Sequence, residues 1–503
     1  MDAFKMIIMM LSAVFLLLIT YLVLRWIKLK QYWAKRGVPY IPPHPVFGSL
    51  TFLRRENPAL WLRRMYDRFK EPYVGLWIFW KPGLLVNSEK IAQNILIRDQ
   101  ANFRNRFASS GTTDPVGSLN LFTLDDPLWS VLRRRLSILF TGSKLRGIQN
   151  NLTVKSKELI ERIDKDRQKP EPINLKAIMV DFSTDITATS TFGMTSDATL
   201  TGESFMKIVT QSYTQYELFR SLSWSCIFFI PELVDFFRFK MFPTEGTEFL
   251  RKVLRTIIAQ RGGLDNKVTE PRDLFDILIM IKQEHDKELN MTENMMLAQA
   301  AAFVQGGFET SACTLSFSIY ELAFSPEIQD KLYNELQEAK DKHGDDLDAG
   351  VLSQLKYLNC VIDETLRKYP VLTWLDRVAL EDYKVDENLT IKAGTPVLVN
   401  MMGLHYDPDI YPEPEKFNPD RFLYMNKSEV KHFAFMPFGE GPRKCIGQRF
   451  GYSTVHHGVT AVILNYKIRP LPNAPKPSEI NFYKNTMFLS TTDLLSVEFV
   501  PRN

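Results

Sequence analysis

The stretch Phe438-Gly439-Glu440-Gly441-Pro442-Arg443-Lys444-Cys445-Ile446-Gly447 decides how the rest of the chain is interpreted. It places one cysteine in a glycine-rich loop, directly after two cations and before an apolar run with helical periodicity. A thiolate is a strongly donating metal ligand, and nearby cations or a helix N-terminus favour it over the thiol. Glycines allow a backbone to approach a large, flat group closely. The usual alternative, an inert buried cysteine, fits this context poorly. The stretch therefore predicts a protected loop that presents the Cys445 sulfur to such a group.

The composition excludes several classes of protein. The chain has 503 residues and a net charge of only +4, which does not indicate a nucleic-acid-binding protein. Its four cysteines are too widely spaced for zinc-type pairs or a secreted disulfide framework, so reduced thiols facing the cytosol fit best. No linker, repeat or low-complexity tract follows residue 50. We therefore expect one large domain over residues 51–503.

The N-terminus predicts a membrane anchor. Residues 6–24 form an almost unbroken apolar run, long enough to cross a bilayer at about 1.5 Å per residue. Basic residues cluster after this run, which places the remainder on the cytosolic side. A cleaved signal peptide is the alternative, but its apolar core would be shorter, with the charges ahead of it. We expect an anchor over residues 1–30 and a proline-rich hinge over residues 31–50, which could also be an ordinary loop.

Hydrophobic periodicity predicts a mainly α chain with small β-sheets, an α+β fold behind a single transmembrane helix. Helical periodicity dominates between residues 127 and 345. The individual helices and strands that we expect include helices at 58–69, 298–322 and 352–369, a helix opened by Cys445, and strands at 73–77, 395–400 and within 480–500.

The 298–322 helix carries two adjacent glycines, Gly306 and Gly307, at its centre. Each mid-helix glycine costs about 1 kcal/mol relative to alanine, so the pair requires a reason. One interpretation is a groove for a small ligand beside Thr310 and Glu309, which would relay protons. Thr310 could bond the carbonyl of Gly306 and loosen the helix there. The alternative is a kink at a helix-packing contact.

A second pair of residues gives only weak evidence of a functional role when it is considered alone. Glu364 and Arg367 lie at i,i+3 on one helix face, where most such pairs are solvated. Arg421, in a later proline-rich stretch, could complete a buried triad with them.

These three motifs, at 306–311, 364–367 and 438–447, occur together in order, and with them the chain resembles the cytochrome P-450 (haem-thiolate monooxygenase) superfamily over essentially its whole length. The stretches at 140–145, 298–300 and 405–408 are similar to the insect microsomal branch, in particular family-6-like, clan-3 enzymes. Gln305 and Gly306 depart from that pattern, which usually has an apolar residue and an alanine there. The Asp126-Pro127 pair is also unusual.

The resemblance implies a role for each matching residue. Cys445 would be the axial thiolate of the iron of haem b. Thr310 and Glu309 would deliver protons, and Phe438 would pack near the thiolate. The structural triad would be Glu364, Arg367 and Arg421. Residues in the positions that hold the haem propionates are Arg443, Arg377, Trp129, Arg133 and Arg106.

The regions that contact substrate in this superfamily are apolar and aromatic here, without a carboxylate to select a cationic substrate. The candidate pocket residues are Phe107, Phe122, Phe303, Leu372, Trp374 and Phe488. Residues 205–242 are rich in phenylalanine, which fits either a lid that dips into lipid or ordinary core packing.

The resemblance further implies the overall function, which is oxidation of lipophilic small molecules, such as plant toxins and insecticides, with O2 and NADPH-derived electrons. The partners would be NADPH–cytochrome P-450 reductase, with cytochrome b5 as a second candidate, on the cytosolic face of the endoplasmic reticulum membrane. Arg134 or Arg135, with Lys431 and Lys444, could form the docking surface or simply a solvated face. The alternatives are a dedicated hormone or pheromone hydroxylase, and a non-catalytic membrane-anchored protein that binds haem or lipid.

Overall fold

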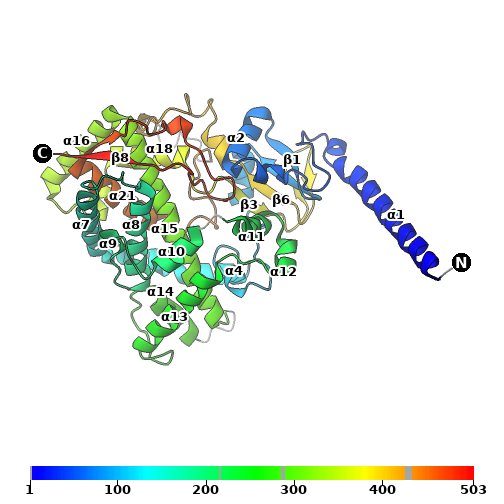
Figure 1. Cartoon of the computed structure of the whole chain (residues 1–503), viewed down its shortest axis with the longest axis horizontal. Helices are drawn as coiled ribbons and strands as arrows, with labels where there is room; N and C mark the ends of the chain where they lie inside the picture. Colours follow the sequence, from blue (N-terminus) through cyan, green and yellow to red (C-terminus); the bar gives the residue numbers. More distant parts are fainter. Residues whose placement is uncertain (1–2, 215–216, 285–288, 425–432, 503) are drawn as a thin grey trace.

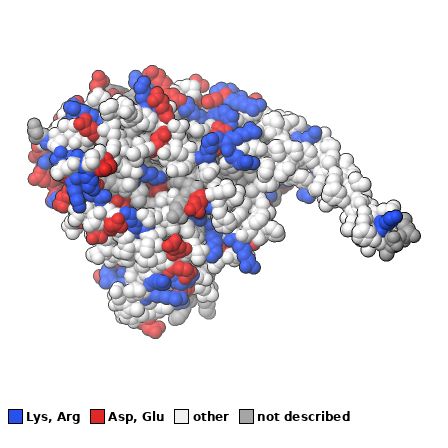
Figure 2. All heavy atoms as spheres, viewed as in Figure 1, with Lys and Arg blue, Asp and Glu red and all other residues white. Residues whose placement is uncertain are grey.

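The protein is mainly helical with small sheets, as predicted, and one helix projects from its body (Figure 1). The computed structural model describes residues 3–214, 217–284, 289–424 and 433–502. Helix α1 (Ala3–Lys30) is the projecting helix, and most of its described side chains are exposed. Among the described residues it is the one helix long and apolar enough to cross a membrane. Figure 2 shows that its surface is almost free of charged side chains, unlike the body.

The main sheet lies at the end of the body from which α1 projects (Figure 1). Its strand order is β1-β2-β6-β3, formed by Tyr73–Ile78, Lys81–Val86, Pro396–Val399 and Leu375–Val378. β2 and β6 are parallel and the other pairs are antiparallel. The segment predicted as a hinge lies against β1, because Trp33 is fully buried and the Ile41 N–H donates to the Gly75 carbonyl at 3.0 Å.

Helix α15 (Glu293–Phe324) runs through the centre of the helical part and is buried along most of its length. Such a helix is apolar on nearly all sides, because other helices surround it. Other helices of the body are α4 (Pro115–Ser118), α5 (Leu128–Leu136), α8 (Leu175–Phe192), α10 (Lys207–Thr214), α11 (Leu218–Phe229), α12 (Val234–Phe237), α18 (Lys356–Lys368), α19 (Met401–His405) and α21 (Gln448–Asn465).

The remaining α-helices and strands lie around these elements. They are α2 (Pro58–Arg68), α3 (Glu89–Gln93), α6 (Gly142–Gly147), α7 (Gln149–Asp166), α9 (Ala198–Thr201), α13 (Thr244–Gln260), α14 (Leu274–Gln283), α16 (Pro326–His343), α17 (Ala349–Leu352), α20 (Asp420–Tyr424), and the strand pairs β4 (Tyr383–Lys384) with β5 (Thr390–Ile391) and β7 (Tyr466–Pro470) with β8 (Val497–Pro501).

Two sequence expectations differ from the structure. The helix expected over 352–369 is interrupted after α17 and restarts at Lys356, because the Tyr357 and Leu358 N–H groups bond the Glu335 carboxylate instead of a preceding turn. Within 480–500 most of the chain is irregular apart from isolated bridges, and the paired strand there, β8, begins at Val497. Its partner β7 was not expected from the sequence.

Candidate active site

A cavity of about 340 Å³ lies against α15, and Cys445 is part of its wall. The other walls come from α5, α11, the segment 371–377 and the loop 437–447. Most of the lining is apolar or aromatic, which is typical of a site for a lipophilic molecule. Three helices and the segment 371–377 therefore converge on the loop that carries the cysteine singled out by the sequence.

The loop of Cys445 is held by its own backbone and by a close neighbour. The Cys445 N–H donates to the Phe438 carbonyl at 2.9 Å. Gly441 has a φ of +75°, and a Cβ there would lie 1.9 Å from the Leu96 carbonyl oxygen, so only glycine fits. The Cys445 side chain is exposed to the cavity, while the surrounding protein shields it from bulk water. Burial raises the pKa of its thiol, and the Gly447 N–H and the Arg133 cation oppose that rise.

Cations surround the cavity beside this loop. Arg106, Arg133, Arg377 and Arg443 all line it, together with Trp129. The Arg443 guanidinium lies 3.9 Å from the centre of the Trp129 ring, and its Nε donates to the Arg104 carbonyl at 2.8 Å. Its two terminal nitrogens, Nη1 and Nη2, are buried without a hydrogen-bond partner among the described residues. Such orphan donors are costly unless a bound group satisfies them.

The charges of this cluster do not balance. Burial, followed by repulsion from Arg106, lowers the pKa of Arg377 to about 9, and burial with repulsion from Arg106 and Arg377 does the same to Arg443. Asp376 is the one carboxylate among the residues lining the cavity, and it is paired with Arg106 at 2.8 Å. Although burial opposes it, Arg106 holds the pKa of Asp376 below its ordinary value. The arginine donors without partners therefore fit a bound group that brings its own carboxylates, such as haem with its two propionates.

The two glycines of α15 have different surroundings. A Cβ on Gly306 would meet nothing within 4 Å, and this residue lines the cavity. A Cβ on Gly307 would lie 2.6 Å from Oγ1 of Thr187 on α8, so Gly307 allows the two helices to pack closely. Gly306 fits the groove interpretation, and Gly307, which lines the cavity as well, fits the helix-packing contact of the alternative without a break in α15. Thr310 Oγ1 lines the cavity and donates to the Gly306 carbonyl at 2.6 Å.

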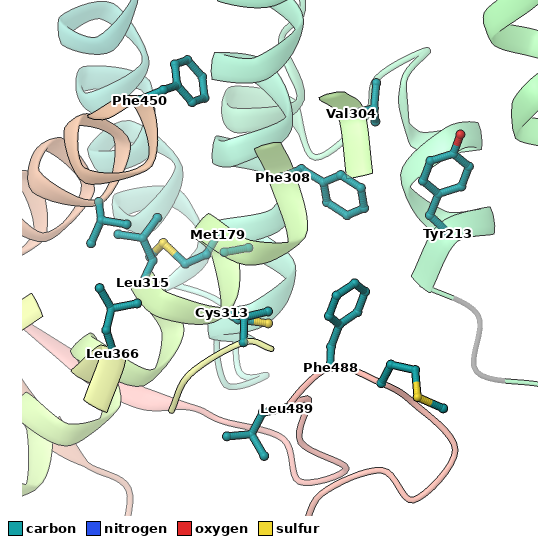
Figure 3. Close-up of a cluster of buried hydrophobic side chains, with 14 of the residues drawn as sticks. Met179, Tyr213, Val304, Phe308, Cys313, Leu315, Leu366, Phe450, Phe488 and Leu489 are labelled. Carbon is teal, nitrogen blue, oxygen red and sulfur yellow. The ribbon is translucent and has the colours of Figure 1, made fainter. Parts of the chain in front are cut away.

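Glu309 is placed differently from Thr310, although the two are adjacent. It is almost fully buried and does not line the cavity. Its carboxylate lies 3.2 Å from Lys176 Nζ of α8 and accepts a long contact of 3.7 Å from the Cys313 thiol. Figure 3 shows the same packed region, in which Phe308 extends from α15 toward Tyr213 and Phe488. Successive residues of a helix point about 100° apart, which explains the divergence.

The predicted triad is formed and buried. Arg367 donates to both carboxylate oxygens of Glu364, at 2.7 and 2.8 Å, and Arg421 Nε donates to Glu364 Oε1 at 3.1 Å. Arg367 also donates to the carbonyls of His405 and Pro414, each at 2.8 Å. Burial alone would lower the pKa of Arg367, but its bonds to Glu364 outweigh burial and raise it. The solvated-pair alternative is therefore excluded for these residues.

Five of the six candidate pocket residues line the cavity, which are Phe122, Phe303, Leu372, Trp374 and Phe488. The sixth, Phe107, is buried outside the lining, and its N–H donates to Asp376 at 2.8 Å. The lining also contains residues that the sequence did not single out as pocket residues, among them Trp224, Phe228 and Asp376. The aromatic density of residues 205–242 was the available signal for the first two.

The aromatic residues described within 205–242 are partly buried in the core and partly exposed. Trp224 and Phe228 of α11 are buried and stack against each other with ring centres 5.7 Å apart. Phe219, Phe236 and Phe237 are instead exposed, and Phe236 retains 78% of its accessible surface. The segment therefore contributes one face to the cavity and another to the molecular surface.

The expected docking cations are only partly available at the surface. Arg134 is exposed, whereas Arg135 is paired with Glu284 at 2.8 Å and Lys444 with Glu440 at 2.9 Å. Lys431 lies outside the described residues.

Comparisons with known proteins agree with this site. Residues 38–499 match the family model described as Cytochrome P450. Cytochrome P450 6k1 of Blattella germanica is 34% identical over 492 residues, covering 93% of each chain, and cytochrome P450 6l1 of the same cockroach is 33% identical over 480 residues, covering 94% of this chain and 93% of the relative. Probable cytochrome P450 6g2 of Drosophila melanogaster is 31% identical over 475 residues, covering 90% of this chain and 91% of the relative.

The match spans the helical body, the cavity and the Cys445 loop, and the relatives carry the family-6 designation that the sequence predicted. The chain belongs to the cytochrome P450 family, as an insect family-6-like haem-thiolate monooxygenase.

Proposed function

We propose that the cavity binds haem b through Cys445 and oxidises lipophilic small molecules, xenobiotics such as plant toxins and insecticides among them. The observation that carries this proposal is the single cysteine facing an aromatic cavity beside arginine donors without partners. Bound at Cys445, haem supplies dioxygen activation, and a thiolate ligand favours O–O cleavage. Arg443, Arg377, Arg106, Arg133 and Trp129 would hold its propionate edge, and Phe438 would pack beside the sulfur.

The residues of α15 would manage the proton supply. Thr310 Oγ1 gives its own proton to the Gly306 carbonyl, which leaves its lone pairs free to accept a hydrogen bond from the cavity. Gly306 keeps space open next to that hydroxyl. Glu309 would act from a position outside the cavity lining, where it is paired with Lys176. Its part in proton delivery would then require the carboxylate to move away from that lysine.

The cavity favours neutral, ring-containing substrates. Its aromatic side chains offer flat apolar surfaces, and its one carboxylate is neutralised by Arg106. Gln305 adds a polar group, since it lines the cavity and its Oε1 is buried without a partner among the described residues. A substrate with a hydroxyl or amine near this amide would satisfy it.

The surroundings of the cavity suit a membrane enzyme. We propose that residues 1–30 anchor the chain in the endoplasmic reticulum membrane, that residues 31–50 orient the domain of residues 51–503, and that this domain faces the cytosol. The exposed Phe219, Phe236 and Phe237 would dip into lipid near α11, so that substrates enter from the bilayer. Electrons would come from NADPH through cytochrome P-450 reductase, with cytochrome b5 as a second donor.

The decisive experiment is the carbon monoxide spectrum of the reduced protein. We expect the red-shifted Soret band that marks thiolate ligation, and we expect Cys445→Ala to lose both the band and NADPH-driven turnover. Cys360→Ala is the matched control, because Cys360 is a buried cysteine far along the chain from the loop and outside the cavity lining. A Cys445→Ala protein with an unchanged band would refute the assignment. Spin-state titration with a panel of plant toxins, insecticides and insect hormones would then test the substrate class.

A further inference from the structure

His405 lies between the buried triad and the loop that leads to Cys445. It ends α19 and has no exposed surface. Its Nδ1 lies 3.0 Å from the Arg367 carbonyl oxygen, and its Nε2 lies 3.2 Å from the Met436 backbone nitrogen. A backbone N–H can only donate, so Nε2 accepts this bond, and the ring proton resides on Nδ1 and is donated to Arg367. The surroundings therefore specify one tautomer.

The imidazole is also held as a neutral ring. Burial lowers the pKa of His405 to about 3, so the ring stays uncharged near neutral pH. The backbone carbonyl of His405 accepts a further bond from Arg367 Nη1 at 2.8 Å, and the Phe435 ring stacks on the imidazole with centres 5.6 Å apart. His405 is thus tied to the triad arginine twice, and its ring has no freedom to turn away from Met436.

From Met436 the hydrogen bonds continue to the cysteine. The Met436 carbonyl accepts the Gly439 N–H at 2.8 Å, and the Phe438 carbonyl accepts the Cys445 N–H at 2.9 Å. A continuous path of bonded groups therefore connects the Glu364–Arg367 pair, through His405, to the backbone of Cys445. His405 opens the 405–408 stretch that resembles the insect branch, but it belongs to neither the triad nor the cysteine loop, so neither of those motifs accounts for this connection.

We infer that His405 is a positioning residue that fixes the start of the Cys445 loop relative to the triad. This inference rests on the proposed role of Cys445 as the haem ligand. A loop anchored only by its own bonds could shift as a unit, whereas a bond to an immobile ring fixes its first residue. Ligands held by such supporting bonds keep their geometry, and loss of the supporting bond weakens the site without unfolding the protein.

The test compares variants of the full-length holoprotein. His405→Phe removes both ring hydrogen-bonding groups and keeps an aromatic ring, and His405→Gln retains a donor and an acceptor. His456→Phe is the matched control, because His456 is also a buried histidine, with a pKa lowered by burial to about 3, and it bonds Asn359 at 3.1 Å outside this path. The readouts are the thiolate-type Soret band of the ferrous carbon monoxide complex, the rate of haem transfer to a haem-free acceptor protein, and helix content by circular dichroism.

We expect His405→Phe to release haem about tenfold faster than the wild type, the loss expected when one buried hydrogen-bonding group is left unpaired. Its thiolate band should decay at temperatures where helix content is intact, and His405→Gln should recover part of the difference. In the wild type and in His456→Phe, the thiolate band and the helix content should disappear together on heating. The inference is overturned if His405→Gln and His405→Phe both release haem at the wild-type rate, or if His405→Phe, starting from wild-type helix content, loses the band only together with that content. A wild-type protein without the thiolate band would instead refute the proposed function itself.

Discussion

Replacing Gly307 with alanine tests how closely α15 and α8 are packed, and Gly306 provides a matched control one residue away. A Cβ at Gly307 would lie 2.6 Å from Thr187 Oγ1 and 2.8 Å from Thr187 Cγ2. Contacts between such atoms are favourable only beyond about 3.5 Å, so the helices must separate or Thr187 must turn. Turning Thr187 would break its bond to the Ser183 carbonyl. Overpacking of this kind costs about 1–3 kcal/mol.

The control removes the contribution of helix propensity. Alanine is about 1 kcal/mol better than glycine inside a helix, and this gain applies equally at both positions. Gly306→Ala should therefore raise the free energy of unfolding by about 1 kcal/mol, since its Cβ meets nothing within 4 Å. Gly307→Ala should be less stable than Gly306→Ala by about 1–3 kcal/mol, the overpacking term alone.

The measurement is denaturant unfolding of the detergent-solubilised protein, followed by circular dichroism. Adding Thr187→Ala to Gly307→Ala removes both clashing atoms and should restore much of the lost stability, as a double-mutant cycle would show. If Gly307→Ala proves as stable as Gly306→Ala, the close packing deduced for α15 and α8 is refuted.

Three further predictions concern the triad, the cavity and the membrane surface. Arg367→Leu leaves a buried carboxylate with one partner fewer, and should lower the free energy of unfolding by about 3–5 kcal/mol in chemical denaturation; an unchanged midpoint would contradict the buried triad. Gln305→Leu should reduce the preference for a hydroxylated ligand over its deoxy analogue by about 1 kcal/mol, measured by spin-state titration, and equal preference in both proteins would remove Gln305 from the substrate site. A chain lacking residues 1–30 should still sediment with lipid vesicles. Changing Phe236 and Phe237 to serine in this shortened chain should weaken its partitioning into the vesicles by about 3 kcal/mol. Unchanged partitioning after the two serine substitutions would locate the lipid contact elsewhere.

The sequence predicted the residues whose role depends on a short motif. Cys445, with its flanking glycines and arginine, and the Glu364–Arg367 pair are each recognisable within a few positions, and the structure shows the cysteine facing the cavity and the pair buried. The mainly α fold with an apolar N-terminal helix followed from periodicity and length. These features are local, so a single chain is sufficient to identify them.

Features that depend on distant partners were not predictable in this way. Nothing near Glu309 indicates that it meets Lys176, more than a hundred positions earlier, rather than the cavity. Phe107 belongs to a region predicted to contact substrate, but its backbone N–H bonds Asp376 of β3 and the residue lies outside the lining. The Gly306–Gly307 pair could be understood only when α8 was in place.

The crowding of arginines around the cavity has a consequence for how the cell can accumulate this protein. Burial, and then repulsion among the arginines, lowers the pKa values of Arg377 and Arg443 to about 9, and both stay cationic at neutral pH. The folded chain without its prosthetic group therefore carries a cost that the unfolded chain does not. A dianionic ligand that binds only the folded state removes that penalty and adds its own binding free energy. The amount of folded protein should therefore follow haem supply, and haem-starved cells should degrade newly made chains, whatever the level of transcription.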